Sequence, residues 1–206
     1  MLGYLIFGIS YAFAAAIQPG PLQTYIIAQT LKKGWRKTLP AVFSPIISDI
    51  PIAFLILLLL SNVPDNFVII LRLAGGLFLV YLAYKSYKSW KEYDSESQTS
   101  EGSAKQTLFS AVIVNILNPN PYLGWSLIMG PMFIKGWQVA PANGIALMVG
   151  FYFVFVITLS AIIILFAFAR KFGPQVIKIS LGISALVLLL FGIYQLWLGT
   201  IFILNI

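Results

Sequence analysis

The sequence predicts an all-α integral membrane protein with six transmembrane helices. The helices are expected to form two inverted-topology repeats of three, with helices 1 and 4 broken at proline motifs. Of the 206 residues, 60% are hydrophobic and only 9% are charged, a composition typical of membrane proteins. Long apolar runs follow one another along the chain, and two proline motifs recur at an offset of 100 residues. These observations together predict the fold class.

Each apolar run is long enough to cross a bilayer as a helix, which takes about 20 residues. In chain order, the expected spans cover residues 1–31, 38–60, 66–84, 106–134, 136–169 and 179–206. The second span contains one charged residue, Asp49, the third contains one, Arg72, and the others contain none. The first run lacks the basic start of a secretory signal peptide, so we interpret it as a retained span.

Basic residues are concentrated in the loops after spans 1, 3 and 5. These loops and their flanks hold eleven of the thirteen Lys and Arg residues: Lys32, Lys33, Arg36, Lys37, Lys85, Lys88, Lys91, Lys105, Arg170, Lys171 and Lys178. Because cytoplasmic loops are enriched in Lys and Arg, this asymmetry predicts that the odd-numbered loops are cytoplasmic and that both termini lie outside. Membrane topology thus explains the net charge of +7, and no nucleic-acid partner is expected.

The two halves of the chain share short motifs in the same order. Residues 17–21, Ile-Gln-Pro-Gly-Pro, correspond to residues 117–121, Leu-Asn-Pro-Asn-Pro, and Lys33-Gly34-Trp35 corresponds to Lys135-Gly136-Trp137. Ordered matches of this kind indicate an internal repeat. Because each half holds an odd number of spans, the second half must enter the membrane from the opposite side, as in many secondary transporters.

The repeat divides the chain into three parts. Residues 1–91 form the first three-helix repeat and residues 105–206 form the second. Between them, residues 92–104 are polar and small, so we expect a cytoplasmic linker rather than a further domain.

Each proline motif interrupts an otherwise apolar span. Proline lacks a backbone donor and clashes with the carbonyl four residues before it. Irregular backbone at membrane depth is tolerated only where protein or water satisfies it. Paired breaks at equivalent positions therefore indicate a cavity in which helix ends present amides and carbonyls to a zwitterion. The residues predicted to bind the substrate are Gln18, Pro19, Gly20, Pro21, Asp49, Asn118, Pro119, Asn120 and Pro121.

Asp49 lies well inside the second span. A charged carboxylate there costs about 3 kcal/mol or more, so it must face the interior of the bundle or a wet cavity. Such a residue suits the exchange of a proton for an ammonium group or a metal ion, and we predict that Asp49 couples transport to protons. The alternative is a structural hydrogen bond, for example with Ser48.

Other kinds of chemistry find no support in the sequence. Cysteine and histidine are absent, which excludes thiol–disulfide chemistry and removes the commonest transition-metal ligand. The spans hold no paired carboxylates, and no Gly-rich phosphate loop occurs. We therefore expect no cofactor, no metal site and no enzymatic activity. Tyr25, Tyr122 and Trp125 are interpreted as packing residues, because aromatic residues are common in spans.

Several motifs together resemble the lysine exporter (LysE/RhtB) superfamily of small efflux transporters. They are Gln18-Pro19-Gly20-Pro21, Ser48-Asp49, Gly75-Gly76 and Leu117-Asn118-Pro119-Asn120, in this order along essentially the whole chain. The resemblance implies export of amino acids, or of metal ions in some relatives, driven by membrane gradients.

The second proline motif bears on the substrate that the resemblance implies. Asn118-Pro119-Asn120 followed by Tyr122-Leu123 is similar to the branch that exports basic amino acids. That branch tends to carry an acid after the Tyr-Leu pair, where this chain has Gly124, and span 2 has Ser44-Pro45 where glycines are common. Both departures change the expected pocket.

The sequence thus favours a proton-coupled exporter of a small amino acid or similar zwitterion or cation, working by alternating access, with basic amino acids preferred. A divalent-cation exporter of the same superfamily is the first alternative, and a membrane scaffold without transport is the second. The expected location is the inner (plasma) membrane. The expected partners are a small-molecule substrate, a coupling ion and membrane lipid, and a homodimer is left open.

Overall fold

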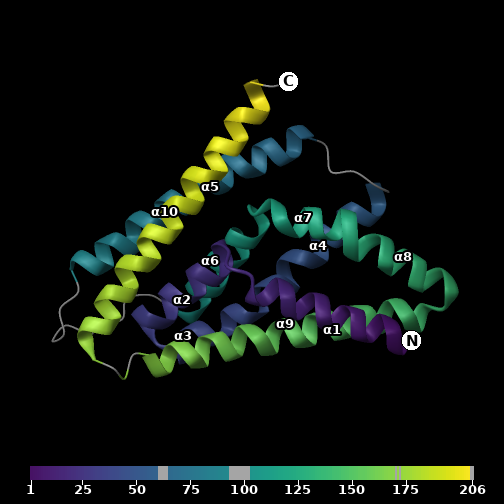
Figure 1. The fold of residues 1–206 in the computed structure, drawn as a ribbon, viewed down its shortest axis with the longest axis horizontal. Helices are drawn as coiled ribbons and strands as arrows, with labels where there is room; N and C mark the ends of the chain where they lie inside the picture. The colour runs from purple at the N-terminus through teal and green to yellow at the C-terminus, as the bar shows by residue number, and fades with distance from the viewer. Residues whose placement is uncertain (60–64, 93–102, 170, 172, 205–206) are drawn as a thin grey trace.

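The fold is helical throughout the part of the chain that the structure describes, and that part contains no strand (Figure 1). The structure is a computed structural model that describes residues 1–59, 65–92, 103–169, 171 and 173–204. Most of the expected linker, residues 93–102, lies outside the described residues.

The described part of the first half contains five α-helices and one 3₁₀ helix. They are α1 (Leu2–Ile17), α2 (Pro21–Lys33), α3 (Trp35–Thr38), the 3₁₀ helix η1 (Leu39–Phe43), α4 (Ser44–Leu59) and α5 (Asp65–Lys91). The second half contains α6 (Ala104–Ile116), α7 (Pro119–Gly124), the π-helical turn η2 (Trp125–Met129), α8 (Gly130–Val139), α9 (Pro141–Ala169) and α10 (Pro174–Leu204).

Four stretches of the described chain are long and apolar enough to cross a membrane. They are Trp35–Leu57, Ile69–Lys91, Pro141–Ala169 and Pro174–Ile201, and the pair α1 and α2, bent by 62° at its break, makes a fifth if it is one span. The run expected as span 4 is divided among α6, α7, η2 and α8. Length and composition alone therefore identify four of the six expected spans, and a fifth if α1 and α2 form one span.

Both proline motifs interrupt helices, as the sequence predicts. Helix α1 ends at Ile17 and α6 ends at Ile116, and the equivalent residues Gln18 and Asn118 share an extended backbone conformation. The helices resume at different points, because α2 begins at the second proline of its motif and α7 begins at the first. Each restart places a proline at the first helical position, where no backbone donor is needed.

The Lys-Gly-Trp motif occurs in both halves, but it adopts a different local structure in each. Gly34 ends α2 with a positive φ of 83°, a conformation that favours glycine. Gly136 instead lies inside α8 and is buried. Equivalent residues in sequence therefore end a helix in the first half and continue one in the second.

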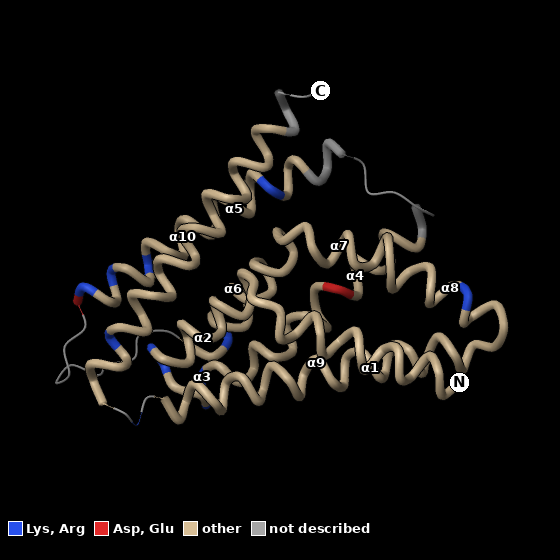
Figure 2. The backbone as a smooth tube through the Cα atoms, in the orientation of Figure 1, with Lys and Arg blue, Asp and Glu red and all other residues tan. Residues whose placement is uncertain are grey.

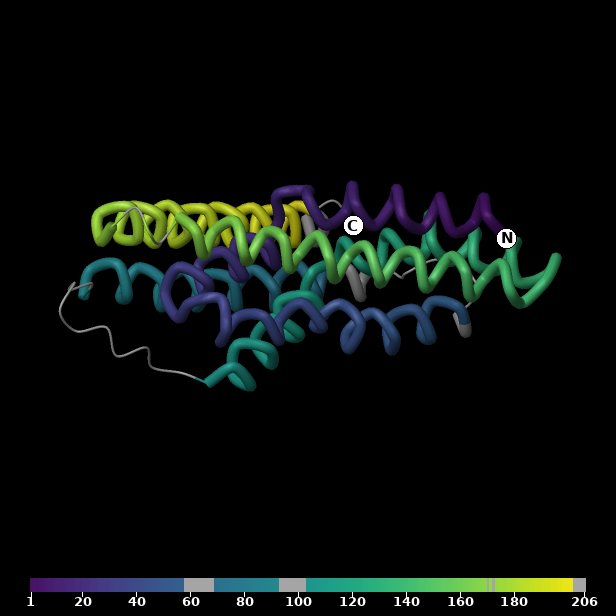
Figure 3. The backbone as a smooth tube through the Cα atoms, turned by 90° about the horizontal axis from the view of Figure 1, so that it is seen from below, coloured from purple at the N-terminus to yellow at the C-terminus, as the bar shows by residue number. Residues whose placement is uncertain are grey.

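Two long helix pairs form the frame of the molecule. Helix α5 runs antiparallel to α10, and α1 lies along α9 (Figure 1). Glycines allow both approaches: a Cβ atom on Gly150 would come within 2.7 Å of the Leu5 carbonyl oxygen, and one on Gly192 within 3.1 Å of the Gly76 oxygen. In the view of Figure 3, α4 and the start of α6 lie on the side away from α1 and α10.

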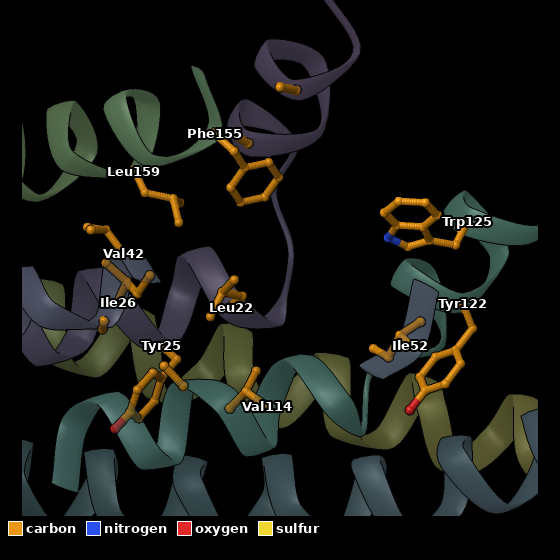
Figure 4. Packing of buried hydrophobic residues seen from close by; sticks show 14 of the residues in the cluster. Leu22, Tyr25, Ile26, Val42, Ile52, Val114, Tyr122, Trp125, Phe155 and Leu159 are labelled. Atoms are coloured by element: carbon orange, nitrogen blue, oxygen red, sulfur yellow. The ribbon is translucent and has the colours of Figure 1, made fainter. Parts of the chain in front are cut away.

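Among the described residues, the interior between these pairs is largely apolar, and the carboxyl group of Asp49 is buried within it. Figure 4 shows Leu22, Ile26, Val42 and Leu159 of the buried cluster, which comes from helices of both halves. The basic residues at the ends of α2 and α5 and near the start of α10 gather at one end of the molecule (Figure 2). The charge asymmetry of the sequence is thus also an asymmetry of the fold.

Candidate functional site

A polar cavity lies where the two broken helices meet α4 and α9. Its volume is about 120 Å³, enough for a few water molecules or a small solute. Seven of the nine residues predicted to bind substrate line it: Gln18, Pro19, Gly20, Asp49, Asn118, Asn120 and Pro121. The other two, Pro21 and Pro119, are buried outside the lining. Motifs a hundred residues apart in the sequence therefore lie around one space.

Asp49 reaches this cavity from α4, near the middle of the 23-residue span Trp35–Leu57, and is only 5% exposed. The Asn115 amide Nδ2 donates to Asp49 Oδ1 at 2.8 Å and to Ser48 Oγ at 2.6 Å. Ser48 Oγ lies 3.4 Å from the same carboxyl oxygen and 2.8 Å from the Ser44 carbonyl. The carboxyl group is thus held by neutral donors from two helices. The hydrogen bond to Ser48, named in the sequence analysis as the structural alternative to proton coupling, is present, and Asn115 makes a shorter one.

At the first helix break, a side chain from the following helix donates hydrogen bonds to the carbonyls at the end of α1. Gln23 Nε2 donates to the carbonyl oxygens of Ala15 at 3.3 Å and of Ala16 at 3.1 Å, which are among the last carbonyls of α1. The Gln18 backbone N–H bonds to the Ala14 oxygen. The two bonds from Gln23 satisfy carbonyls that the proline motif leaves without helical partners. The interruption between α1 and α2 is therefore stabilised by specific hydrogen bonds.

The second helix break is stabilised by a different set of contacts. Asn118 Oδ1 accepts a hydrogen bond from the Asn120 N–H at 3.1 Å, so Asn118 caps α7. Gly75 of α5 packs directly on the backbone carbonyl of Leu117, at a point where a Cβ atom would collide. Close packing against the break thus requires a glycine at position 75.

Some lining residues escaped the sequence analysis. Tyr11 of α1, Phe151 and Phe155 of α9, Gln23 and Asn115 all line the cavity. Figure 4 shows Phe155 and Leu22 lying apart from Trp125, and all three contribute to the lining. Asn115 could have been found as a polar residue one turn before the proline motif. The aromatic residues carry no such signal, because aromatic residues occur throughout the spans.

The three aromatic residues interpreted as packing residues are all buried, but they differ in whether they line the cavity. Tyr25 and Tyr122 are buried in the apolar cluster and lie outside the cavity lining. The Tyr25 hydroxyl donates to the Thr107 carbonyl at 3.4 Å. Trp125 is buried and also forms part of the cavity wall.

The described lining contains one carboxylate, several amide groups and interrupted backbone. Within the described residues, no group of three or more His, Cys, Asp or Glu side chains could hold a metal ion. Hard cations take about six to eight oxygen ligands from carboxylates, carbonyls and water. The arrangement is better suited to one ammonium group beside a carboxylate and an anionic group at a helix start.

Helices of membrane-spanning length around a polar cavity with interrupted backbone are typical of membrane transport proteins. A family model described as LysE type translocator matches residues 13–199, and the chain belongs to that family. The resemblance carried by the proline motifs is thereby confirmed, and members of this family are transporters rather than enzymes. Comparisons with curated proteins and with solved structures found no match.

Proposed function

We propose that the protein is a secondary-active exporter of a small amino acid or similar zwitterion, coupled to protons through Asp49. The observation that carries this proposal is the cavity where Asp49 meets both helix breaks. A scaffold would gain nothing from a polar cavity lined by a buried carboxyl group.

The two ends of the cavity lining suit the two charges of an amino acid. Asp49 is the partner for the substrate ammonium group. The start of α2 is the partner for its carboxylate, because Gly20, Leu22 and Gln23 line the cavity there and the first backbone N–H groups of a helix have no intrahelical acceptor. The positive end of the helix dipole adds to this attraction.

Proton coupling follows from competition for one carboxyl group. Asp49 binds either a proton or the substrate ammonium group, and alternating access exposes it to the two sides in turn. Moving one charge across 100 mV is worth about 2.3 kcal/mol, which supports roughly a 50-fold concentration ratio. One exchanged proton is therefore sufficient for useful export.

The substrate class depends on two opposing features. The sequence resemblance favours basic amino acids, as Asn118-Pro119-Asn120 indicates. The cavity is small, and Gly124 packs so closely on Tyr11 that a Cβ atom there would lie 2.8 Å from the tyrosine oxygen. An acidic side chain at position 124 would therefore displace Tyr11. Among the described lining residues, Asp49 is the carboxylate that can pair with an ammonium group. We therefore expect substrates with a single ammonium group to compete well with basic ones.

The proposal includes the six-span architecture. The matching breaks after Ile17 and Ile116 support two inverted repeats, residues 1–91 and 105–206, with α6, α7, η2 and α8 together serving as span 4. Residues 92–104 then link the repeats on the cytoplasmic side of the plasma membrane, and both termini lie outside.

The decisive test is counterflow in proteoliposomes. Liposomes preloaded with an unlabelled compound should accumulate the labelled form when the protein is present. The panel should contain lysine, arginine, threonine, alanine and Mn²⁺, with protein-free liposomes as the control. Accumulation of an amino acid that responds to a pH gradient is the expected result. Accumulation of Mn²⁺ alone, or of nothing in the panel, would contradict the proposal.

A further inference from the structure

A groove of about 710 Å³ runs between α5 and α10, which lie side by side (Figure 1). We call it the α5–α10 groove. None of its lining residues lines the cavity around Asp49, so it is a separate feature of the molecule. Its lining is aromatic on one helix and aliphatic on the other, and includes Tyr84, Tyr87 and Trp90 of α5 and Ile183, Leu186 and Leu189 of α10.

The groove has a floor of small residues between walls of large ones. Ala83 and Ala185 are buried, whereas Ile183, Leu186 and Tyr84 are more than half exposed. Both helices are long and apolar enough to span a membrane, so these exposed apolar walls face the hydrocarbon of the bilayer. Pockets of about 300–1,000 Å³ hold small organic ligands. The groove is therefore large enough to hold part of a lipid chain.

Glycine contacts give the register of the two antiparallel helices. A Cβ atom on Gly192 would lie 2.8 Å from Val80 Cγ2, and one on Gly182 would lie 3.1 Å from Trp90 Nε1. Ten residues toward the end of α5 thus correspond to ten residues toward the start of α10. The last turns of α5 therefore lie beside the first turns of α10.

Two lysines lie at this end of the groove, one on each helix. Lys91 is four residues after Tyr87, so the two share a face of α5. Lys178 is four residues before Gly182, so these two share a face of α10. In the register given by the glycines, the two lysine positions are within about one helical turn of each other. Both side chains are exposed, and both can reach a ligand at the end of the groove.

The acidic residue next in the sequence belongs to another part of the molecule. Glu92 lies 3.9 Å from Lys88, and these two residues line a different cavity, between α2, α5 and α6. Neither of them lines the α5–α10 groove. The charge that Lys91 and Lys178 offer to a ligand at the end of the groove is therefore positive.

Aromatic residues separate the apolar part of the groove from its lysines. The rings of Tyr87 and Trp90 lie 5.5 Å apart between their centroids. Tyrosine and tryptophan are enriched where a membrane meets water, at the level of the lipid headgroups. The groove thus passes from aliphatic residues, through an aromatic pair, to two ammonium groups. A phospholipid has the matching order of acyl chain, glycerol backbone and phosphate.

We propose that the α5–α10 groove binds an anionic phospholipid, with an acyl chain along the groove and the phosphate beside Lys91 and Lys178. Lysine binds phosphate as a compact point charge, and basic pockets between transmembrane helices bind lipid headgroups. A zwitterionic lipid brings its own cation to the lysines and binds more weakly. A bound lipid would join α5 to α10 and so stabilise the folded protein.

A second copy of the chain fits the groove less well than a lipid does. In a twofold dimer about an axis along the membrane normal, the same residues of both copies lie at the same level. Lys91 and Lys178 of one copy would then lie at the level of the same two lysines of the other. Like charges repel, whereas a lipid phosphate attracts them.

The first experiment titrates the purified full chain in neutral detergent with dioleoyl phosphatidylglycerol and, in parallel, with dioleoyl phosphatidylcholine. Native mass spectrometry measures the bound lipid, and the melting temperature should rise more with phosphatidylglycerol. Each lysine beside an anionic lipid is worth roughly fivefold in affinity, so Lys91→Gln/Lys178→Gln should bind phosphatidylglycerol roughly 25-fold more weakly. Equal affinity of the wild type for the two lipids would overturn the proposal.

The matched control is Lys105→Gln/Lys135→Gln, which removes two exposed lysines outside the groove lining. It changes the net charge by the same amount and should alter the affinity for phosphatidylglycerol less than twofold. A loss as large as that of the groove variant would show that net charge, and no particular site, attracts the lipid.

A second experiment tests the apolar part of the groove. Glycerol 3-phosphate carries the phosphate without the chains, and a large excess of it should not displace phosphatidylglycerol. Displacement would show that the groove contributes nothing. Because the chain has no cysteine, Ile183→Cys places a single thiol on the groove wall. A disulfide-linked dimer of this variant, formed on oxidation in phosphatidylglycerol liposomes, would show that a second copy covers the groove and would also overturn the proposal.

A folding defect can be separated from a loss of binding. The ratio of the affinities for the two lipids is measured on each variant by itself, so a general loss of stability does not change it. The ratio should fall close to one in Lys91→Gln/Lys178→Gln and stay at the wild-type value in Lys91→Arg/Lys178→Arg, which keeps both charges. A wild-type ratio in the glutamine variant would show that these lysines do not hold the phosphate.

Discussion

Replacing Asp49 by asparagine should separate proton coupling from folding. The Asn115 Nδ2 donor lies 2.8 Å from Asp49 Oδ1, and an asparagine side chain offers an oxygen at the same place. The helix contact is therefore kept. A charged carboxylate at the centre of a span is unfavourable by about 2.5–3.5 kcal/mol, so its removal should leave the melting temperature unchanged or raise it.

The expected loss of substrate affinity can be worked from the same geometry. A hydrogen bond to a charged group contributes about 1.5–3 kcal/mol, and the Asp49→Asn variant retains only a neutral acceptor for an ammonium group. Since about 1.4 kcal/mol corresponds to a factor of ten, binding should weaken roughly 10- to 100-fold. Without a group that exchanges protons, transport driven by a pH gradient should disappear.

The assay is flux into and out of proteoliposomes with and without a pH gradient, combined with substrate titration of the detergent-solubilised protein. Asp49→Glu should keep part of the coupled activity, because the carboxyl group remains and only its position shifts. Glu92→Gln removes an exposed acidic group outside the cavity lining and serves as the matched control. Undiminished, pH-dependent flux through Asp49→Asn would show that this carboxyl group is structural and that protons move elsewhere.

Three further predictions concern the helix breaks and the topology. Gln23→Leu leaves two carbonyls at the end of α1 without their side-chain donor, so it should lower the free energy of unfolding by about 1–3 kcal/mol. Denaturant-induced unfolding in detergent measures this change, and an unchanged midpoint would contradict the role of Gln23. Gly75→Ala places a methyl group against the Leu117 carbonyl and should destabilise the protein by about 1–3 kcal/mol, whereas Gly3→Ala, which meets nothing within 4 Å, should not; equal stabilities of the two variants would refute the packing explanation. In intact cells, an impermeant thiol reagent should label a Gly3→Cys variant but not a Ser97→Cys variant, and the reverse pattern would show that the topology is inverted.

Which segments are apolar enough to span a membrane, and where two of them break, can be predicted from the residues alone. Proline has no backbone donor, so the ends of α1 and α6 follow from local chemistry alone. The same holds for Asp49, because a carboxyl group within an apolar run must face a polar space whatever the fold. The restart of α7 at Pro119 rather than Pro121 is a finer detail, set by the cap that Asn118 provides.

Which side chains face one another depends on how the helices pack in three dimensions. Lipid tails are about as apolar as a leucine side chain, so a helix face buried in the protein and one exposed to lipid have similar compositions. Phe153 is 65% exposed while Phe151, two residues before it, lines the cavity, and hydropathy does not distinguish them. The contact between Asn115 and Asp49 joins residues 66 positions apart. Such pairings depend on how the helices rotate and pack, which apolar spans do not encode in their pattern of residue types.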